Sequence, residues 1–386
     1  MKKILIISNS YPNFGGQSTT AYNLLKLLQQ DSELKTRLLY INYHKQADAD
    51  PDNTGKSDKI ALRQNLPYKI YQWYKNRFSG NSKPLYKIIL ILKDLYFSTL
   101  LLPRIFYQML RKRYYPDLVI TNIPVYYNLL KRVFNPQKIL VLAGSSSEMY
   151  ELSKTGMDAQ TVLADSAKAI SLLKHFQSVN YAKTNVIFNS ALTRDVYAAL
   201  QIPAGNARVQ YFNFVPLIPD AFIPFQERRN DIAFIASLYD RSIKNAALAY
   251  NIFESMPDVK KLAIGKHNEH FANLPNTETG SIIKQTEILQ KLRDTKLLII
   301  TSFFDSSPGV LSEAIMSGCN VLVSKNVGWH EKLDERCVVQ NYNNLQEWID
   351  KATHLLQHKI DYSVFIEMTA NAGNNIISDI KTLARQ

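Results

Sequence analysis

The chain is poor in cysteine and shows no targeting segment at its start. Its 386 residues include two cysteines, Cys319 and Cys337, which are too few for a disulfide framework and favour a reducing compartment. The opening MKKILIISNS is basic, but its apolar run is short and no small-residue cleavage site follows, so it predicts a first β-strand and not a signal peptide. We expect a cytoplasmic protein, with two domains as the default at this length.

Motifs for metals, nucleotide loops and hydrolytic nucleophiles are also missing. The sequence has no P-loop, no G-x-S-x-G elbow and no G-x-G-x-x-G fingerprint. His267 and His270 flank Glu269 without the spacing of a zinc protease, and His354 and His358 stand four residues apart with no evident third ligand. We therefore expect no bound metal and no resident cofactor.

Acidic residues are scarce in the first half of the chain. Residues 1–210 carry 28 Lys and Arg against 13 Asp and Glu, a net charge of +15, whereas residues 211–386 carry 18 against 20, a net charge of −2. A basic half joined to a nearly neutral half indicates an anionic partner on one side. A phospholipid surface, a lipid-pyrophosphate acceptor and a nucleic acid all carry the required charge.

Residues 66–116 concentrate basic and aromatic side chains. Lys93, Asp94 and Arg104 interrupt the apolar run, so the segment cannot supply the ~18–20 uncharged residues of a membrane span. Such a segment suits peripheral contact with an anionic membrane, and it equally suits a core helix pair with lysines facing water. Single-strand nucleic-acid binders have a similar composition, but no RRM, KH or OB pattern is visible, so no nucleic acid is expected.

Alternating strand and helix patterns predict an α/β fold. Apolar runs predict buried strands at residues 3–9, 36–43, 117–122, 138–144, 185–190, 209–215, 231–239, 261–265, 297–302 and 320–324. Helix patterns lie between them, including a long one at 158–178, and the polar residues 45–65 predict a mobile loop. The three prolines of 216–230 predict a linker, which separates a first domain, 1–215, from a second domain, 216–365.

The first strand leads into a glycine pair and then a helix. Gly15 and Gly16 predict a tight loop; without a G-x-G-x-x-G pattern it gives poor support for a dinucleotide, and one interpretation is a turn that merely needs glycine. The helix that follows has its apolar residues three and four positions apart, and these are Ala21, Leu24, Leu25 and Leu28.

The stretch from Ser302 to Glu331 carries the most chemical information. A loop of sequence FDSSPG leads into a helix pattern, and backbone N–H groups at such a helix start hold anionic oxygens. Glu313 is expected in the first or second turn, where its carboxylate can accept hydrogen bonds from a neutral diol such as ribose. With Asp305 eight positions earlier, the stretch fits a sugar nucleotide, which needs N–H groups for its pyrophosphate and a carboxylate for its ribose.

The same stretch resembles the donor-site signature of retaining GT-B glycosyltransferases of family 4 (glycosyl transferases group 1), roughly E-G-x-P-N-V-L-x-E-A-M-A-x-G-x-P-V-V-A-S. The resemblance covers about twenty positions. It departs at Asp305, where the family has Glu, and at Cys319-Asn320. It implies the GT-B fold, in which two Rossmann-like domains face each other across a cleft and the C-terminal helix, about 366–386, crosses back. The matching positions include Pro308, Val310, Leu311, Glu313, Ala314, Met316 and Gly318.

The resemblance also implies the donor-site residues. In the family an Arg and a Lys clamp the donor pyrophosphate; FIASLYDRSIKN has Lys244 at the lysine, Ser237 at the arginine position, and Arg241 four residues later. We therefore expect catalytic roles for Asp305, Glu313, Lys244 and Arg241. The expected donor-binding residues are Gly15, Gly16, Ser307, Pro308, Gly309, Val310, Leu311 and Glu313.

On the acceptor side, the family usually has a His after the strand that here ends LVLAGSSS. This chain has Gly144 and Ser145 there, so Ser145, Ser146 and Glu148 are the candidate acceptor-side residues. In a retaining transferase the leaving phosphate can itself take the acceptor's proton. Positioning and electrostatics then matter more than a strong base.

The function expected from these residues is retaining sugar transfer from a nucleoside diphosphate sugar to a glycan or lipid-linked acceptor. The basic first half suggests bacterial cell-envelope polysaccharide synthesis, such as capsule or lipopolysaccharide, at the inner face of the inner membrane. The departures at Asp305, Ser237 and Gly144 leave a catalytically degenerate GT-B subunit, which binds a glycan or partner, as an alternative. A sugar-nucleotide epimerase and a basic nucleic-acid binder are further alternatives.

Overall fold

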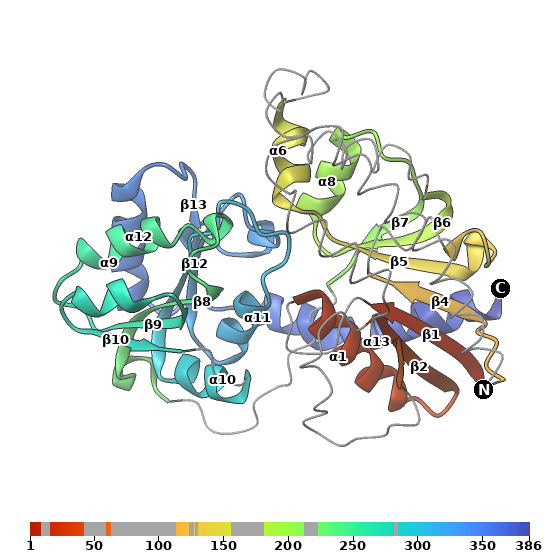
Figure 1. The fold of residues 1–386 in the computed structure, drawn as a ribbon. Helices are drawn as coiled ribbons and strands as arrows, with labels where there is room; N and C mark the ends of the chain where they lie inside the picture. The colour runs from red at the N-terminus through yellow and green to blue at the C-terminus, as the bar shows by residue number, and fades with distance from the viewer. Residues whose placement is uncertain are drawn as a thin grey trace. The chain divides into compact units, whose positions relative to one another are not determined.

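The chain divides into two compact units, each built on its own sheet (Figure 1). The computed structural model describes residues 1–8, 16–41, 59–62, 113–122, 127, 130–155, 181–211, 223–281 and 285–386. The first unit comprises Met1–Phe188, Arg194–Phe212 and Gly373–Gln386, and the second comprises Asn189–Thr193 and Asn213–Ala372.

The first sheet has seven strands, all parallel, in the order β3-β2-β1-β4-β5-β6-β7. They are β1 (Lys2–Ser8), β2 (Leu34–Ile41), β3 (Lys59–Leu62), β4 (Leu118–Thr121), β5 (Ile139–Ala143), β6 (Tyr181–Phe188) and β7 (Ala204–Val209). The central strands are continuous apolar runs because parallel sheets are covered on both faces, and all of β5 is buried. The strand order reverses between β1 and β4, which is the topological switch point of this unit.

Two expectations for the first unit are wrong. Residues 45–65, expected as a loop, contain β3, whose four residues KIAL are too few to stand out among polar neighbours. The expected strand 209–215 is met only at Val209, the last residue of the edge strand β7; residues 210 and 211 do not continue it, and residues 212–215 lie outside the described residues. The sequence of β7, AGNARV, has no apolar pattern because this edge strand is largely exposed.

Two further predictions fall outside the described residues. The helix pattern at 158–178 lies wholly outside them, and so does the basic, aromatic segment 66–116 up to residue 112. Of the helices that the described residues do form, none combines the length and apolar character that a membrane span requires.

The first unit contains α1 (Gly16–Gln29), α6 (Ser147–Thr155), most of α8 (Ala191–Ala199) and the second half of α13 (Ser363–Arg385). The apolar stripe predicted for α1 is confirmed, since all four of its residues are buried. Gly16, which was expected in a loop, is the first residue of α1. The C-terminal part of α13 lies beside α1 (Figure 1), where Lys381 Nζ is 2.6 Å from the carboxylate of Asp31.

The second sheet has six parallel strands in the order β10-β9-β8-β11-β12-β13. They are β8 (Asn230–Leu238), β9 (Lys261–Lys266), β10 (Thr277–Gly280), β11 (Thr295–Ile300), β12 (Asn320–Ser324) and β13 (Val338–Val339). The four strands predicted from apolar runs are confirmed. The edge strands β10 and β13 are too short and, in β10, too polar to be predicted from an apolar run.

Helices cover both faces of the second sheet. On one face α9 (Ala246–Glu254) packs on α12 (Leu345–Gln357), and on the other α10 (Gln285–Arg293) packs on α11 (Gly309–Met316) (Figure 1). The strand order reverses between β8 and β11, so the loops that follow these two strands meet at the switch point of this unit. Those loops carry Lys244 and Asp305.

Candidate functional site

The loop after β8 brings a lysine to the switch point of the second sheet. It contains a 3-10 helix, Ser242–Lys244, whose last residue is Lys244. Asn245 then adopts a left-handed conformation with φ of 46°, and its side-chain oxygen accepts a hydrogen bond from the N–H of Leu248 at 3.3 Å. This cap starts α9 and fixes the backbone of Lys244 immediately before a helix N-terminus.

The loop after β11 is tied to the loop after β8. The N–H of Phe303 donates to the carbonyl of Ile243 at 2.8 Å. The hydroxyl of Thr301 donates to the carbonyls of Lys244 and Asn245, each at 3.1 Å. The two loops therefore form one connected surface at the carboxyl ends of β8 and β11, which is where open α/β sheets bind ligands.

Lys244 and Asp305 meet on this surface. The Nζ atom of Lys244 lies 2.5 Å from a carboxylate oxygen of Asp305, although 61 residues separate them in the sequence. The two side chains are 22% and 17% exposed, so water screens their attraction less than that of a surface ion pair, while a ligand can still reach them. The structure thus brings together two of the four residues predicted to be catalytic.

Asp305 is held in place from two sides. Its N–H donates to the carbonyl of Asn326 at 3.1 Å, and its carbonyl accepts from the N–H of Gly328 at 2.7 Å. A Cβ atom at Gly328 would overlap the carbonyl oxygen of Ser306, so glycine is required for this close approach. The carboxylate oxygen that does not contact lysine accepts from the N–H of Ser307 at 3.3 Å, so both carboxylate oxygens have a partner.

Helix α11 begins directly after this loop with an open first turn. Pro308 occupies the N-cap position, and its side chain makes no capping hydrogen bond. The first N–H groups of any helix have no partner within the helix and form the positive end of its dipole. Nothing lies within 4 Å of the position that a Cβ atom would take at Gly309. A phosphate group therefore has room to approach the backbone here.

Glu313 is the fifth residue of α11 and lies in its second turn. Its half-buried carboxylate accepts a 2.7 Å hydrogen bond from the amide of Gln285, the first residue of α10. Burial raises the pKa of Glu313 above its ordinary value, and the hydrogen bond from Gln285 works against this rise. A carboxylate that has lost part of its hydration gains from hydroxyl groups that donate to it, as those of a ribose do.

The other residues predicted around the donor differ in what they can offer. Arg241 is exposed at the start of the 3-10 helix and makes no ion pair with any residue in the described ranges. Ser237, at the position of the family's arginine, is exposed near the end of β8. Val310 is half-buried, but Leu311 is 1% exposed and packs into the core, so only its backbone can face a ligand.

The residues predicted in the first domain lie in the other unit. Gly15 is outside the described residues, and Gly16 opens α1. Ser145 and Ser146 follow β5 at its carboxyl end, where the hydroxyl of Ser146 accepts from the N–H of Met149 at 3.3 Å and so caps α6. Glu148 is the second residue of α6; its side chain is outside the described part of the chain.

Three residues of the second unit's site were not predicted. Gln285 contacts Glu313, as described. The hydroxyl of Tyr342 accepts from the side-chain amide of Asn245 at 2.6 Å and donates to the carbonyl of Thr301 at 2.9 Å, which braces both loops. Phe303 is a large apolar residue left 37% exposed beside them. No motif marks Gln285 or Tyr342. The exposure of Phe303 could have been predicted from the polar SFFDSS loop only if the end of the preceding strand had been known.

The described residues contain no group of three His, Cys, Asp or Glu side chains arranged to hold a metal ion. The rings of His354 and His358 lie 4.5 Å apart on and just after α12, without a third such ligand in the same part of the structure. The side chains and backbone groups described above for this site are one lysine, two carboxylates, a nearby arginine and the N–H groups at the start of α11.

Comparison with known proteins gives a result for structure but not for sequence. No protein-family model matches the chain, and no curated protein matches it either. Solved structures do match over almost the whole length. Sucrose-phosphate synthase from Thermosynechococcus elongatus superposes with a TM-score of 0.63 at 14% identity and covers 100% of this chain and 97% of its own.

Two further matches have the same extent. WaaG, a glycosyltransferase involved in lipopolysaccharide biosynthesis, has a TM-score of 0.61 at 11% identity, covering 98% of this chain and 99% of its own. HepE from Anabaena, in complex with UDP-glucose, has a TM-score of 0.55 at 14% identity, covering 100% and 98%. These neighbours are GT-B glycosyltransferases, and this chain has the same two-sheet GT-B fold.

Proposed function

We propose that this protein is a glycosyltransferase that moves a sugar from a nucleoside diphosphate sugar to an acceptor. The observation that carries the proposal is the gathering of Lys244, Asp305 and the open N-terminus of α11 at the switch point of the second sheet. A GT-B fold alone would not indicate this, because one fold hosts many functions. HepE, which has the same fold, is in complex with UDP-glucose, and this supports a nucleotide sugar as the ligand.

The side chains of the site divide the work as follows. Lys244 and the first N–H groups of α11 hold the diphosphate, and the exposed Arg241 adds a second cation from the adjoining loop. The carboxylate of Glu313 accepts hydrogen bonds from the ribose hydroxyls. Negative charge builds on the leaving diphosphate as the glycosidic bond breaks, and a fixed cation near it stabilises that transition state more than the ground state.

The transfer is proposed to retain configuration, as the resemblance to the retaining family implies. The leaving phosphate takes the acceptor's proton, and the protein contributes position and charge in place of a strong base. Gly144 and Ser145 stand where the resembled family has a histidine, which is consistent with this division of labour. Ser145, Ser146 and Glu148 are proposed to face the acceptor.

The acceptor is proposed to be a glycan or a lipid-linked glycan in bacterial cell-envelope polysaccharide synthesis. The net charge of +15 on residues 1–210 supports an anionic acceptor or surface. WaaG, a neighbour of the same fold, is involved in lipopolysaccharide biosynthesis. The protein would then work on the cytoplasmic face of the inner membrane, with residues 66–116 as the peripheral contact.

The proposal is tested first by nucleotide binding. UDP, GDP, ADP and dTDP are added in turn to the purified protein, and at least one should raise the thermal midpoint, because a ligand stabilises the folded form that it binds. The variant Lys244→Met should lose this response. Lys260→Met is the matched control, since Lys260 is an exposed lysine that precedes β9, at the amino ends of the strands.

Turnover is tested next with the sugar nucleotide of the base that binds. Slow hydrolysis of that sugar nucleotide, or transfer to a lipid-linked or glycan acceptor, supports the glycosyltransferase. Nucleotide binding without turnover on any acceptor points to the degenerate GT-B subunit. No response to any of the four nucleotides refutes the proposal.

A further inference from the structure

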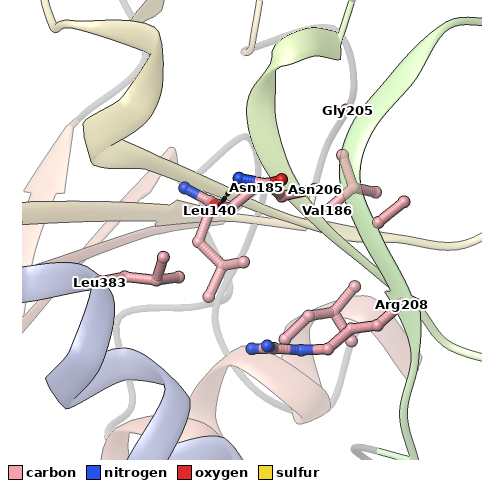
Figure 2. Close-up of a pocket in the computed structure, with 9 residues that line it drawn as sticks. Leu140, Asn185, Val186, Gly205, Asn206, Arg208 and Leu383 are labelled. Atoms are coloured by element: carbon pink, nitrogen blue, oxygen red, sulfur yellow. Dashed lines mark hydrogen bonds between the residues drawn. The ribbon is translucent and has the colours of Figure 1, made fainter.

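The first unit contains a pocket that the proposed donor site does not use. Its volume is about 360 Å³, which falls within the roughly 300–1,000 Å³ of small-molecule sites. It is lined by residues of β5, β6 and β7 and by one residue of α13, and Figure 2 shows them as sticks. All of them belong to the first unit, whereas Lys244 and Asp305 belong to the second.

Strand register places a row of three side chains across one face of the sheet in this pocket. Leu140 pairs with Asn185, and Asn185 pairs with Asn206, so the three stand side by side on β5, β6 and β7. Residues paired across parallel strands point to the same face of the sheet. Arg208 lies two residues beyond Asn206 and therefore points to that face as well. Leu383 of α13 closes the pocket on the helix side.

The two asparagines are hydrogen-bonded to each other, and Asn206 keeps further donor and acceptor positions. Asn185 is 8% exposed; its amide donates to the carbonyl of Gln137 at 3.0 Å, and its oxygen accepts from the amide of Asn206 at 3.5 Å. A carboxamide has two donor hydrogens and two acceptor positions. Asn206 is exposed, so a donor and an acceptor on the same planar group remain available at the mouth of the pocket.

The charged groups at this face cancel each other. The guanidinium of Arg208 lies 2.5 Å from the carboxylate of Asp379 on α13, and the side chains are 45% and 26% exposed. Arginine has five N–H donors, so it can keep this partner and still donate to a ligand. Because the positive charge is already matched, the pocket gives little attraction to an anion. What it offers is planar, paired hydrogen-bonding groups beside the edge of Leu383, whereas Leu140 lies fully buried beneath them.

We infer that this pocket binds a neutral saccharide unit, a pyranose ring whose neighbouring hydroxyls meet Asn206 and Arg208 while its C–H face lies against the exposed edge of Leu383. Adjacent hydroxyl groups both donate and accept, as a carboxamide and an arginine–carboxylate pair require. The site goes beyond the proposed sugar transfer. It would hold a glycan residue on the first unit and contribute affinity without chemistry.

The test uses the full chain without nucleotide and three probes, D-glucose, D-galactose and N-acetyl-D-glucosamine, in saturation-transfer NMR titrations. At least one sugar should receive saturation from the wild-type protein at millimolar concentration. Asn206→Leu should weaken its binding about tenfold, the effect of losing one or two hydrogen bonds, and Asn206→Trp should abolish it by filling the pocket. Asn273→Leu and Asn273→Trp, at an exposed asparagine of the second unit, should leave it unchanged.

Competition with UDP and with inorganic phosphate, together with the variant Lys244→Met, separates this pocket from other sites. Saturating UDP and the variant Lys244→Met should both leave the sugar signal intact, so the outcome does not depend on whether a nucleotide binds. Absence of a signal from all three sugars overturns the inference, as does a signal that both Asn206 variants leave unchanged. Displacement by UDP assigns the sugar to the second unit, and displacement by inorganic phosphate makes the pocket an anion site; either result also overturns it.

Discussion

Removing the carboxylate of Asp305 is expected to strengthen the binding of a bare nucleoside diphosphate. In the unliganded protein this carboxylate lies 2.5 Å from Lys244 Nζ and offsets its charge. A diphosphate that reaches Lys244 must also come close to Asp305, and the two negative groups repel each other. Asp305→Asn keeps the shape of the side chain and its contact with the N–H of Ser307 but deletes that repulsion.

The magnitude follows from Coulomb's law in a partly screened site. Two unit charges about 5 Å apart interact by roughly 3 kcal/mol at an effective dielectric constant of 20 and by under 1 kcal/mol in bulk water. Since Asp305 is 17% exposed, we take about 1–2 kcal/mol, which is roughly a 5- to 30-fold gain in affinity for UDP. Lys244→Met has the opposite sign. It removes a charge-assisted hydrogen bond of about 1.5–3 kcal/mol, so affinity falls roughly 10- to 150-fold.

The measurement is isothermal titration of UDP, or of whichever nucleotide the panel selects, into the two variants and the double variant. Lys260→Met and Asp258→Asn are the matched controls, because both residues are exposed on the segment that precedes β9. Asp305→Asn, Lys244→Met and the double variant should all lose sugar transfer if Asp305 also orients Lys244 or the donor sugar. Weaker UDP binding in Asp305→Asn, at an unchanged thermal midpoint, would refute the electrostatic reasoning.

Three further outcomes are expected. Gly309→Ala should leave the thermal midpoint unchanged or slightly higher, since a Cβ atom meets open space and alanine favours helices by roughly 0.5–1 kcal/mol, yet it should weaken nucleotide binding by crowding the N-terminus of α11. The pKa of Glu313 in the folded protein lies above its ordinary value of 4.5. The contribution of Glu313 to stability therefore falls as the pH rises from 4.5 to the pKa of the folded state. Glu313→Gln should therefore be less sensitive to pH there and more stable at pH 7 by urea unfolding, while losing nucleotide affinity; an unchanged pH profile contradicts this. Asn320→Ala should lower the unfolding free energy by roughly 3 kcal/mol. The buried Asn320 amide donates to the carbonyls of Leu355 and His358, and these carbonyls have no water to replace it. The control variant Asn273→Ala should change the unfolding free energy little.

Much of the second sheet could be predicted from local sequence. The strands β8, β9, β11 and β12 are apolar runs because parallel strands are covered on both faces, and this leaves a strong signal. The strands β3, β10 and β13 were not predicted, because strands of two to four residues at sheet edges need few apolar side chains. The departure at Asn320 from the resembled signature also has a structural reason, since its amide satisfies carbonyls at the end of α12, a partner that no local pattern names.

The candidate site divides in the same way. The sequence alone determined which residue types were present and where each lay relative to its own strand or helix: Lys244 after β8, Asp305 after β11 and Glu313 within α11. Only the tertiary structure decided that Lys244 pairs with Asp305 and that Gln285 donates to Glu313, because contacts between residues 61 and 28 positions apart depend on strand order. In a parallel sheet the strand order decides which carboxyl-end loops become neighbours, and that order is set by the packing of the whole unit.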